Sequence, residues 1–162
     1  MTGLELWPAG GRPWRLVTDT VMGGVSQGTV QLTEIEGQPA ARMRGAVSTE
    51  NNGGFIQIAL DLASDGSAFD ASRFTGLGLE VSGNGESYGV HLRTTELVRP
   101  QHSYRSSFTA TTKLERLEFP FAQFVPHRVE TPLNVARLRR IGLVAIGRAF
   151  DADLSVARLW LY

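Results

Sequence analysis

The sequence predicts an all-β protein, an antiparallel jelly-roll sandwich of about ten short strands. Three observations lead to this prediction. Apolar and polar residues alternate in many short segments, helical segments are few, and glycine contributes 18 of the 162 residues. The glycines are scattered between the apolar segments, as expected where many strands are joined by tight turns.

The strands are expected in a regular succession along the chain. Alternation is clearest over residues 56–62, 77–81, 88–92 and 117–121, and further strands are expected near 14–18, 28–33, 40–48, 103–110, 138–147 and 153–161. The pair Asn84-Gly85 predicts a hairpin between 75–82 and 87–95, because a primed turn needs positive φ at both central residues. Single helical turns are expected at 121–124 and 133–138, the second capped by Asn134.

Length and composition indicate one domain spanning residues 1–162, with no linker, repeat or low-complexity tract to divide it. The 16 basic residues balance the 16 acidic ones, so no basic excess favours nucleic acid or anionic lipid. Cysteine is absent, which excludes disulfides, thiolate catalysis and cysteine-based metal sites. No signal peptide, transit peptide or bilayer-length apolar stretch is visible, and we expect a cytoplasmic protein without membrane insertion.

The motifs that would indicate an enzyme are missing from the sequence. It has no nucleophile elbow and no P-loop, and the glycine pairs at 76–81 and 83–88 lack the third glycine of a dinucleotide fingerprint. The acidic pairs Asp151/Asp153 and Asp61/Asp65 could hold Ca²⁺, but Asx-turns are the favoured interpretation. We therefore expect no catalytic residue, no metal and no cofactor.

A polar sheet face is the candidate site for a small ligand. If the strands around 88–92 and 103–110 pair, His91, Arg93 and Arg105 project from one face, with Tyr104 or Trp14 as a stacking platform. Two guanidinium groups and an imidazole could bind a carboxylate, a phosphate or sugar hydroxyls. The favoured alternative is an ordinary solvated face whose arginines pair with Glu80 or Glu118.

Two glycine-rich loops are the most unusual segments of the sequence. In the first, residues 18–28, Asp19 can accept hydrogen bonds from following amides, Gly23-Gly24 permit a tight backbone, and Ser26 could close the loop. Its apolar residues Val21, Met22 and Val25 either tuck beneath the loop or offer a contact surface, and physical reasoning favours tucking. In the second loop, residues 48–55, a polar cluster leads into Gly53-Gly54.

These loops resemble those of the complex I intermediate-associated proteins, and the similarity covers nearly the whole chain. It runs through residues 19–26, 45–55, 77–81, 83–85, Tyr88, 92–94, 119–121, Phe124 and 141–143. The chain departs from the family pattern at Asn84, where the family often has Asp, and at Leu114, where it tends to carry Trp.

The resemblance implies a galactose-binding-like β-sandwich and a non-enzymatic, chaperone-like role in assembling respiratory NADH:ubiquinone oxidoreductase. The expected partner is then a respiratory-complex subunit or an assembly intermediate. We expect contact through the two loops, at Asp19, Met22, Gly23, Gly24, Ser26, Asn51 and Asn52. The alternative is a small-ligand or carbohydrate-binding module that uses His91, Arg93, Tyr104 and Arg105.

Overall fold

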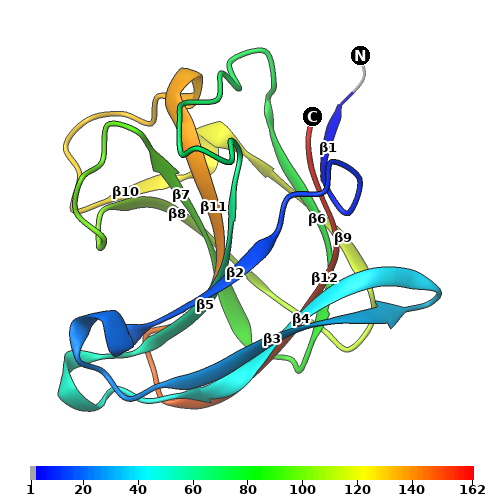
Figure 1. The fold of residues 1–162 in the computed structure, drawn as a ribbon, viewed down its shortest axis with the longest axis vertical. Helices are drawn as coiled ribbons and strands as arrows, with labels where there is room; N and C mark the ends of the chain where they lie inside the picture. Colours follow the sequence, from blue (N-terminus) through cyan, green and yellow to red (C-terminus); the bar gives the residue numbers. More distant parts are fainter. Residues whose placement is uncertain (1–2) are drawn as a thin grey trace.

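Two antiparallel β-sheets pack face to face in the computed structural model, which describes residues 3–162 (Figure 1). Sheet A has the strand order β3-β4-β12-β6-β9, and β1 also pairs with β12. Sheet B has the order β10-β8-β7-β11-β5-β2. The predicted all-β jelly-roll fold is therefore confirmed.

The strands of sheet A are β1 (Leu4–Trp7), β3 (Gln27–Ile35), β4 (Gln38–Val47), β6 (Gly76–Gly83), β9 (Glu115–Pro120) and β12 (Phe150–Leu161). Those of sheet B are β2 (Trp14–Thr18), β5 (Phe55–Asp61), β7 (Ser87–Thr94), β8 (Ser103–Thr109), β10 (Val125–His127) and β11 (Leu138–Ile146). Of these, β1 and β10 were not predicted, because three or four residues are too few to show an alternation.

The core lies between the two sheets and is built from the alternating residues that the sequence indicates. Ile56, Ile58 and Leu60 of β5 are fully buried, as are Leu77 and Leu79 of β6. Each strand thus turns one set of side chains inward to form the core, and the alternate set lies on the outer faces of the two sheets.

The predicted hairpin at Asn84-Gly85 is wrong, because β6 and β7 belong to different sheets. Only Gly85 has positive φ there, so the segment does not form the primed turn of a hairpin. Asn84 instead bridges the sheets: its amide donates to the carbonyl of Asp151 and its oxygen accepts from the hydroxyl of Tyr88. The segment is a corner over which the chain passes from sheet A to sheet B.

Short 3₁₀ turns complete the fold: η1 (Asp19–Met22), η2 (Glu50–Asn52), η3 (Phe121–Gln123) and η4 (Val135–Arg137). The turns η3 and η4 confirm the two predicted helical turns, and the side chain of Asn134 accepts from the amide of Ala136 as the predicted cap. Within residues 3–162, no helix has the length and apolarity needed to cross a membrane.

Candidate functional site

The buried carboxylate of Asp19 joins the two glycine-rich loops. Its Oδ1 accepts from the amide of Ser26 at 3.0 Å, and its Oδ2 accepts from the Ser26 hydroxyl at 2.5 Å and the Gly54 amide at 2.6 Å. The amide of Phe55 adds a bond of 3.2 Å. Gly24 and Gly53 pack so closely on this carboxylate that a Cβ atom at either position would lie 2.5 Å from it. The loops therefore form one preorganised unit.

Hydrogen bonding keeps Asp19 charged despite its burial. Burial alone would raise the pKa of Asp19, but the hydrogen bonds from Ser26, Gly54 and Phe55 outweigh it and lower the pKa below the ordinary value. Asp19, Gly24 and Ser26 are buried and cannot touch a partner themselves. Their role is to position the loop.

The apolar residues of the first loop are exposed, so the predicted tucking is wrong. Val21 is 69% exposed and Met22 is 51% exposed. The space beneath them is occupied by the Asp19 carboxylate and its donors. Gly23 and Asn51 are also exposed, whereas the side chain of Asn52 lies outside the described part of the structure. The loop thus presents an apolar rim on a fixed backbone.

A groove of about 370 Å³ on the outer face of sheet B unites the two sites that the sequence suggested separately. One side is formed by Val21 and Met22, and the other by His91, Arg93 and Arg105. The strands β7 and β8 do pair, and His91 lies directly opposite Arg105 in the register. The remaining lining comes from β2, the second loop, β5, β11 with the following Gly147, and the segment 100–101.

Among the described residues, Arg93 and Arg105 of this groove have no glutamate partner, contrary to the solvated-face alternative. Within residues 3–162, neither Arg93 nor Arg105 forms a salt bridge. Burial lowers the pKa of both guanidinium groups, and neighbouring arginines act in the same direction. Glu80, one suggested partner, binds Arg158 on the other sheet.

Glycines at outward positions of β7 and β11 make room for two side chains that line the groove, those of His91 and Gln57. The ring of His91 lies over Gly89, where an added Cβ would be 2.9 Å from the Nε2 of His91. The side chain of Gln57 lies over Gly142, where an added Cβ would be 2.5 Å from the Oε1 of Gln57. Burial lowers the pKa of His91 to about 3, and the charges of Arg105 and His127 contribute to the shift. His91 is therefore neutral at physiological pH and adds hydrogen-bonding capacity without charge.

The expected aromatic platform for a sugar is not formed by Tyr104 or Trp14. Tyr104 is fully buried and donates its hydroxyl to the carbonyl of Thr131, because its place in β8 turns it into the core. Trp14 packs partly buried against the core, and Trp7 and Trp160 are buried. Apart from the imidazole of His91, Phe55 is the only aromatic side chain among the described groove residues.

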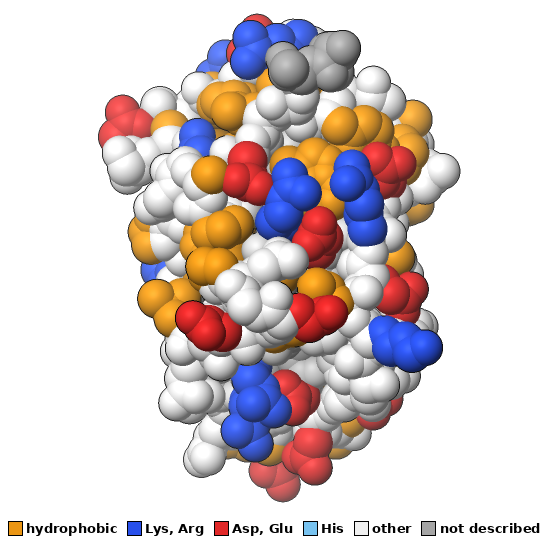
Figure 2. All heavy atoms as spheres, turned by 90° about the vertical axis from the view of Figure 1, so that its right-hand side faces the viewer, with side chains coloured by type: hydrophobic (Ala, Val, Ile, Leu, Met, Phe, Trp, Pro, Cys, Tyr) orange, Lys and Arg blue, Asp and Glu red, His pale blue; other side chains and the backbone are white. Residues whose placement is uncertain are grey.

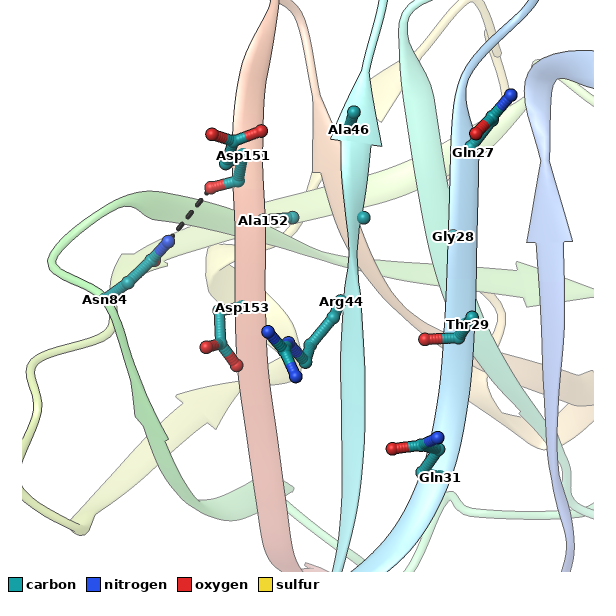
Figure 3. Close-up of a pocket in the computed structure, with 11 residues that line it drawn as sticks. Gln27, Gly28, Thr29, Gln31, Arg44, Ala46, Asn84, Asp151, Ala152 and Asp153 are labelled. Atoms are coloured by element: carbon teal, nitrogen blue, oxygen red, sulfur yellow. Dashed lines mark hydrogen bonds between the residues drawn. The ribbon is translucent and has the colours of Figure 1, made fainter.

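A second hollow, of about 700 Å³, lies over β3, β4 and β12 on sheet A (Figure 3). Polar side chains of Gln27, Thr29 and Gln31 face Arg44 and two aspartates across its floor (Figure 3). Asp153 is already engaged by a bidentate pair with Arg42, at 2.9 and 2.7 Å. Asp153 is thus already neutralised within the protein, unlike Arg93 and Arg105 of the groove.

Sequence reasoning missed several groove residues, among them Gln57, Phe55 and Ile146. Their outward positions in β5 and β11 were available from the alternation. The missing information was the pairing order, which places β5 and β11 beside β7 and brings the second loop to the same face.

The fold is similar to that of solved carbohydrate-binding modules. A family 11 module from Clostridium thermocellum, solved with a β-1,3-1,4-mixed-linked tetrasaccharide, aligns with a TM-score of 0.76 and 13% identity over 99% of this chain and 96% of that chain. A family 30 module of a Clostridium thermocellum cellulosomal cellulase aligns with a TM-score of 0.73 and 11% identity over 100% and 98%. At such identities the similarity establishes the fold alone.

The comparison with curated protein sequences finds no match. The comparison with family models does find one, that of complex I intermediate-associated protein 30, over residues 8–156. The match includes both glycine-rich loops, the Asp19 carboxylate that joins them and every strand that lines the groove. The chain therefore belongs to the complex I intermediate-associated protein 30 family.

Proposed function

We propose that this protein is a non-catalytic binding module that recognises an unassembled subunit or assembly intermediate of a respiratory complex. The groove on sheet B is the recognition site, and binding shields apolar surface of the partner until assembly proceeds. Family membership supports the class of partner. The observation that carries the proposal is the exposure of Val21 and Met22 on a loop that is already rigid.

Exposed apolar residues on a preorganised loop favour protein contact for two reasons. Burial of a Val or Met side chain contributes about 1.5–3 kcal/mol. A loop that is already fixed by the Asp19 carboxylate loses little further conformational entropy when a partner binds. Methionine, being flexible and polarizable, also adapts to partner surfaces of different shape.

The test is capture of a respiratory-complex subunit by the tagged protein from detergent-solubilised membranes, with the captured chains identified by mass spectrometry. We expect the wild type to recover such a subunit and a Val21→Ser/Met22→Ser variant to lose most of it. Leu32→Ser is the matched control, because Leu32 is 79% exposed on the other sheet. Equal recovery by all three proteins, or recovery of no such subunit by the folded wild type, would contradict the proposal.

Carbohydrate binding is the second candidate, favoured by the family 11 module that was solved with a tetrasaccharide. The groove volume of about 370 Å³ also falls within the range of small-ligand sites. The scarcity of aromatic side chains in the groove is the argument against it. A thermal-shift measurement with mixed-linked β-glucan oligosaccharides tests this candidate, since a ligand at 100 times its Kd stabilises the folded state by about 2.7 kcal/mol.

A further inference from the structure

Four groups with cationic or imidazole side chains face the groove: His91, Arg93, Arg105 and Arg140. Arg140 is neutralised by Asp61, with its Nε 2.7 Å from the carboxylate. The described residues offer no such carboxylate to Arg93 or Arg105. Carboxylates also pair with Arg42, Arg148 and Arg158, through Asp153, Glu86 and Glu5. The groove therefore holds two half-buried guanidinium groups that no carboxylate of the described residues neutralises.

Hydrogen bonds hold both guanidinium groups in place and leave donors available. The Nη1 of Arg93 donates to the carbonyls of Arg99, Pro100 and His102, at 2.7 to 3.1 Å. The Nε of Arg105 donates to the Ser103 hydroxyl at 2.8 Å. Among the described residues, the Nη2 of Arg93 and both Nη atoms of Arg105 have no side-chain or carbonyl acceptor. Fixed donors of this kind match a carboxylate, which accepts two parallel bonds.

The side of the groove toward the first loop is apolar. Val21 and Met22 form its rim, and Phe55, Val144 and Ile146 continue it toward the floor. A ligand that fills the groove must therefore combine an anionic group with an adjacent apolar one. A segment of polypeptide with an acidic residue next to an apolar residue has this combination.

We propose that the groove binds an extended segment of the partner through an Asp or Glu carboxylate, held by Arg93 and Arg105, while a neighbouring apolar side chain packs on Val21 and Met22. This inference rests on the proposed function and adds to it the chemistry of the recognised segment. Arg105 and Arg93 set the specificity, whereas Val21 and Met22 contribute apolar contact area that tolerates different side chains.

The test uses the full chain and two capped hexapeptides, one alternating leucine with glutamate and one alternating leucine with glutamine. Binding is followed by chemical-shift changes and calorimetry. We expect the glutamate peptide to bind at least about tenfold more tightly, the preference that a charge-assisted hydrogen bond gives. Shifts should appear at Arg93, Arg105, Val21 and Met22.

Two variants test whether Arg105 causes the preference for the glutamate peptide. Arg105→Gln should reduce it to less than about threefold, while Arg137→Gln should leave it intact. Arg137 is the matched control because its Nε also donates to a hydroxyl, that of Thr95, and because its loss changes the net charge equally. Loss of the preference in both variants would show a general charge effect and overturn the inference.

The remaining outcomes separate this inference from the proposed function. If both peptides bind equally, or neither binds at millimolar concentration, the carboxylate inference fails, while capture of a respiratory-complex subunit remains an independent result. If sodium glutarate or inorganic phosphate alone binds as tightly as the glutamate peptide, the groove is a site for a free small anion. The inference that it binds a polypeptide segment is then overturned.

Discussion

The shape of the first glycine-rich loop depends on the carboxylate of Asp19. Replacing Asp19 with Ala leaves the amides of Ser26 and Gly54 without their acceptor in a buried position. We expect Asp19→Ala to lower the free energy of unfolding by about 2–4 kcal/mol, measured by denaturant titration. Asp65→Ala is the control: Asp65 accepts from the amide and hydroxyl of Ser67 in the same way but is exposed, so its loss should lower the free energy of unfolding much less. Equal losses would mean that burial of the Asp19 carboxylate does not matter.

The imidazole of His91 makes stability depend on pH. Burial, with Arg105 and His127 nearby, lowers the pKa of His91 from 6.5 to about 3 in the folded protein. Between these values the unfolded chain binds a proton at this residue that the folded chain does not. The free energy of unfolding should therefore fall as the pH drops below 6.5, by at most about 1.4 kcal/mol per pH unit.

The variant His91→Gln isolates this contribution. Other titrating groups are common to both proteins, so they cancel in the difference between the two stability profiles. The difference should be constant above pH 7 and should shrink or reverse as the pH falls toward 4. A difference that stays constant over the whole range would show that His91 is protonated equally in both states.

At the scale of the strands, a glycine at an outward position determines where a side chain of the groove lies. Gly142→Ala places a Cβ 2.5 Å from the Oε1 of Gln57, the mobile end of a long side chain that lines the groove, so this side chain must move. We expect stability to change by less than about 1 kcal/mol, with partner capture reduced several-fold. Gly78→Ala, on sheet A, instead places its Cβ against the Trp160 ring and should lower the free energy of unfolding by about 1–3 kcal/mol without a specific effect on the groove.

The two glycine variants separate folding from binding. Thermal unfolding measures the first effect and capture per folded molecule measures the second. If Gly142→Ala lost as much stability as Gly78→Ala, or captured the partner as well as the wild type, the position of the Gln57 side chain would not have the role assigned to it.

The alternation of apolar residues predicted most strands correctly, but it did not predict which strands pair with one another. It identified the inward faces of β5 and β6, because side chains in a strand project alternately to opposite sides. Alternation carries no information about which strand pairs with which, and for this reason the Asn84-Gly85 corner was mistaken for a hairpin. The pairing of β7 with β8 was only a condition of the suggested sheet-face site; the structure fulfils this condition and so brings His91, Arg93 and Arg105 together.

The position of Val21 and Met22 could not be obtained from the sequence for a related reason. Whether these side chains are buried depends on what lies beneath the loop. The Asp19 carboxylate lies there, in contact with Gly53 and Gly54, which are more than 30 positions away in the chain. Local propensity favours burial of apolar residues, but a long-range hydrogen-bond network excludes it here.

At the scale of the whole molecule, zero net charge conceals an uneven distribution. On the side of the molecule at the right of Figure 1, acidic and basic side chains lie interspersed (Figure 2). Pairs such as Arg158 with Glu5 and Glu80 belong to sheet A. On sheet B, Arg93 and Arg105, which no carboxylate of the described residues neutralises, lie together in the groove. Recognition by this protein therefore depends on a local field and not on its overall charge.

A concentration of like charge at a binding site should reduce the stability of the unbound protein. Burial and the nearby Arg128 lower the pKa of Arg105, so the folded state disfavours its charge. We expect Arg105→Gln to unfold about 2 °C above the wild type at low ionic strength, and the gain to shrink in 0.5 M salt, which screens repulsion between the arginines. Arg42→Gln, which removes the partner of Asp153, should lower the Tm instead. A lower Tm for Arg105→Gln at every salt concentration would mean that its bond to Ser103 outweighs the repulsion, and that the groove arginines are retained for the fold and not for a ligand.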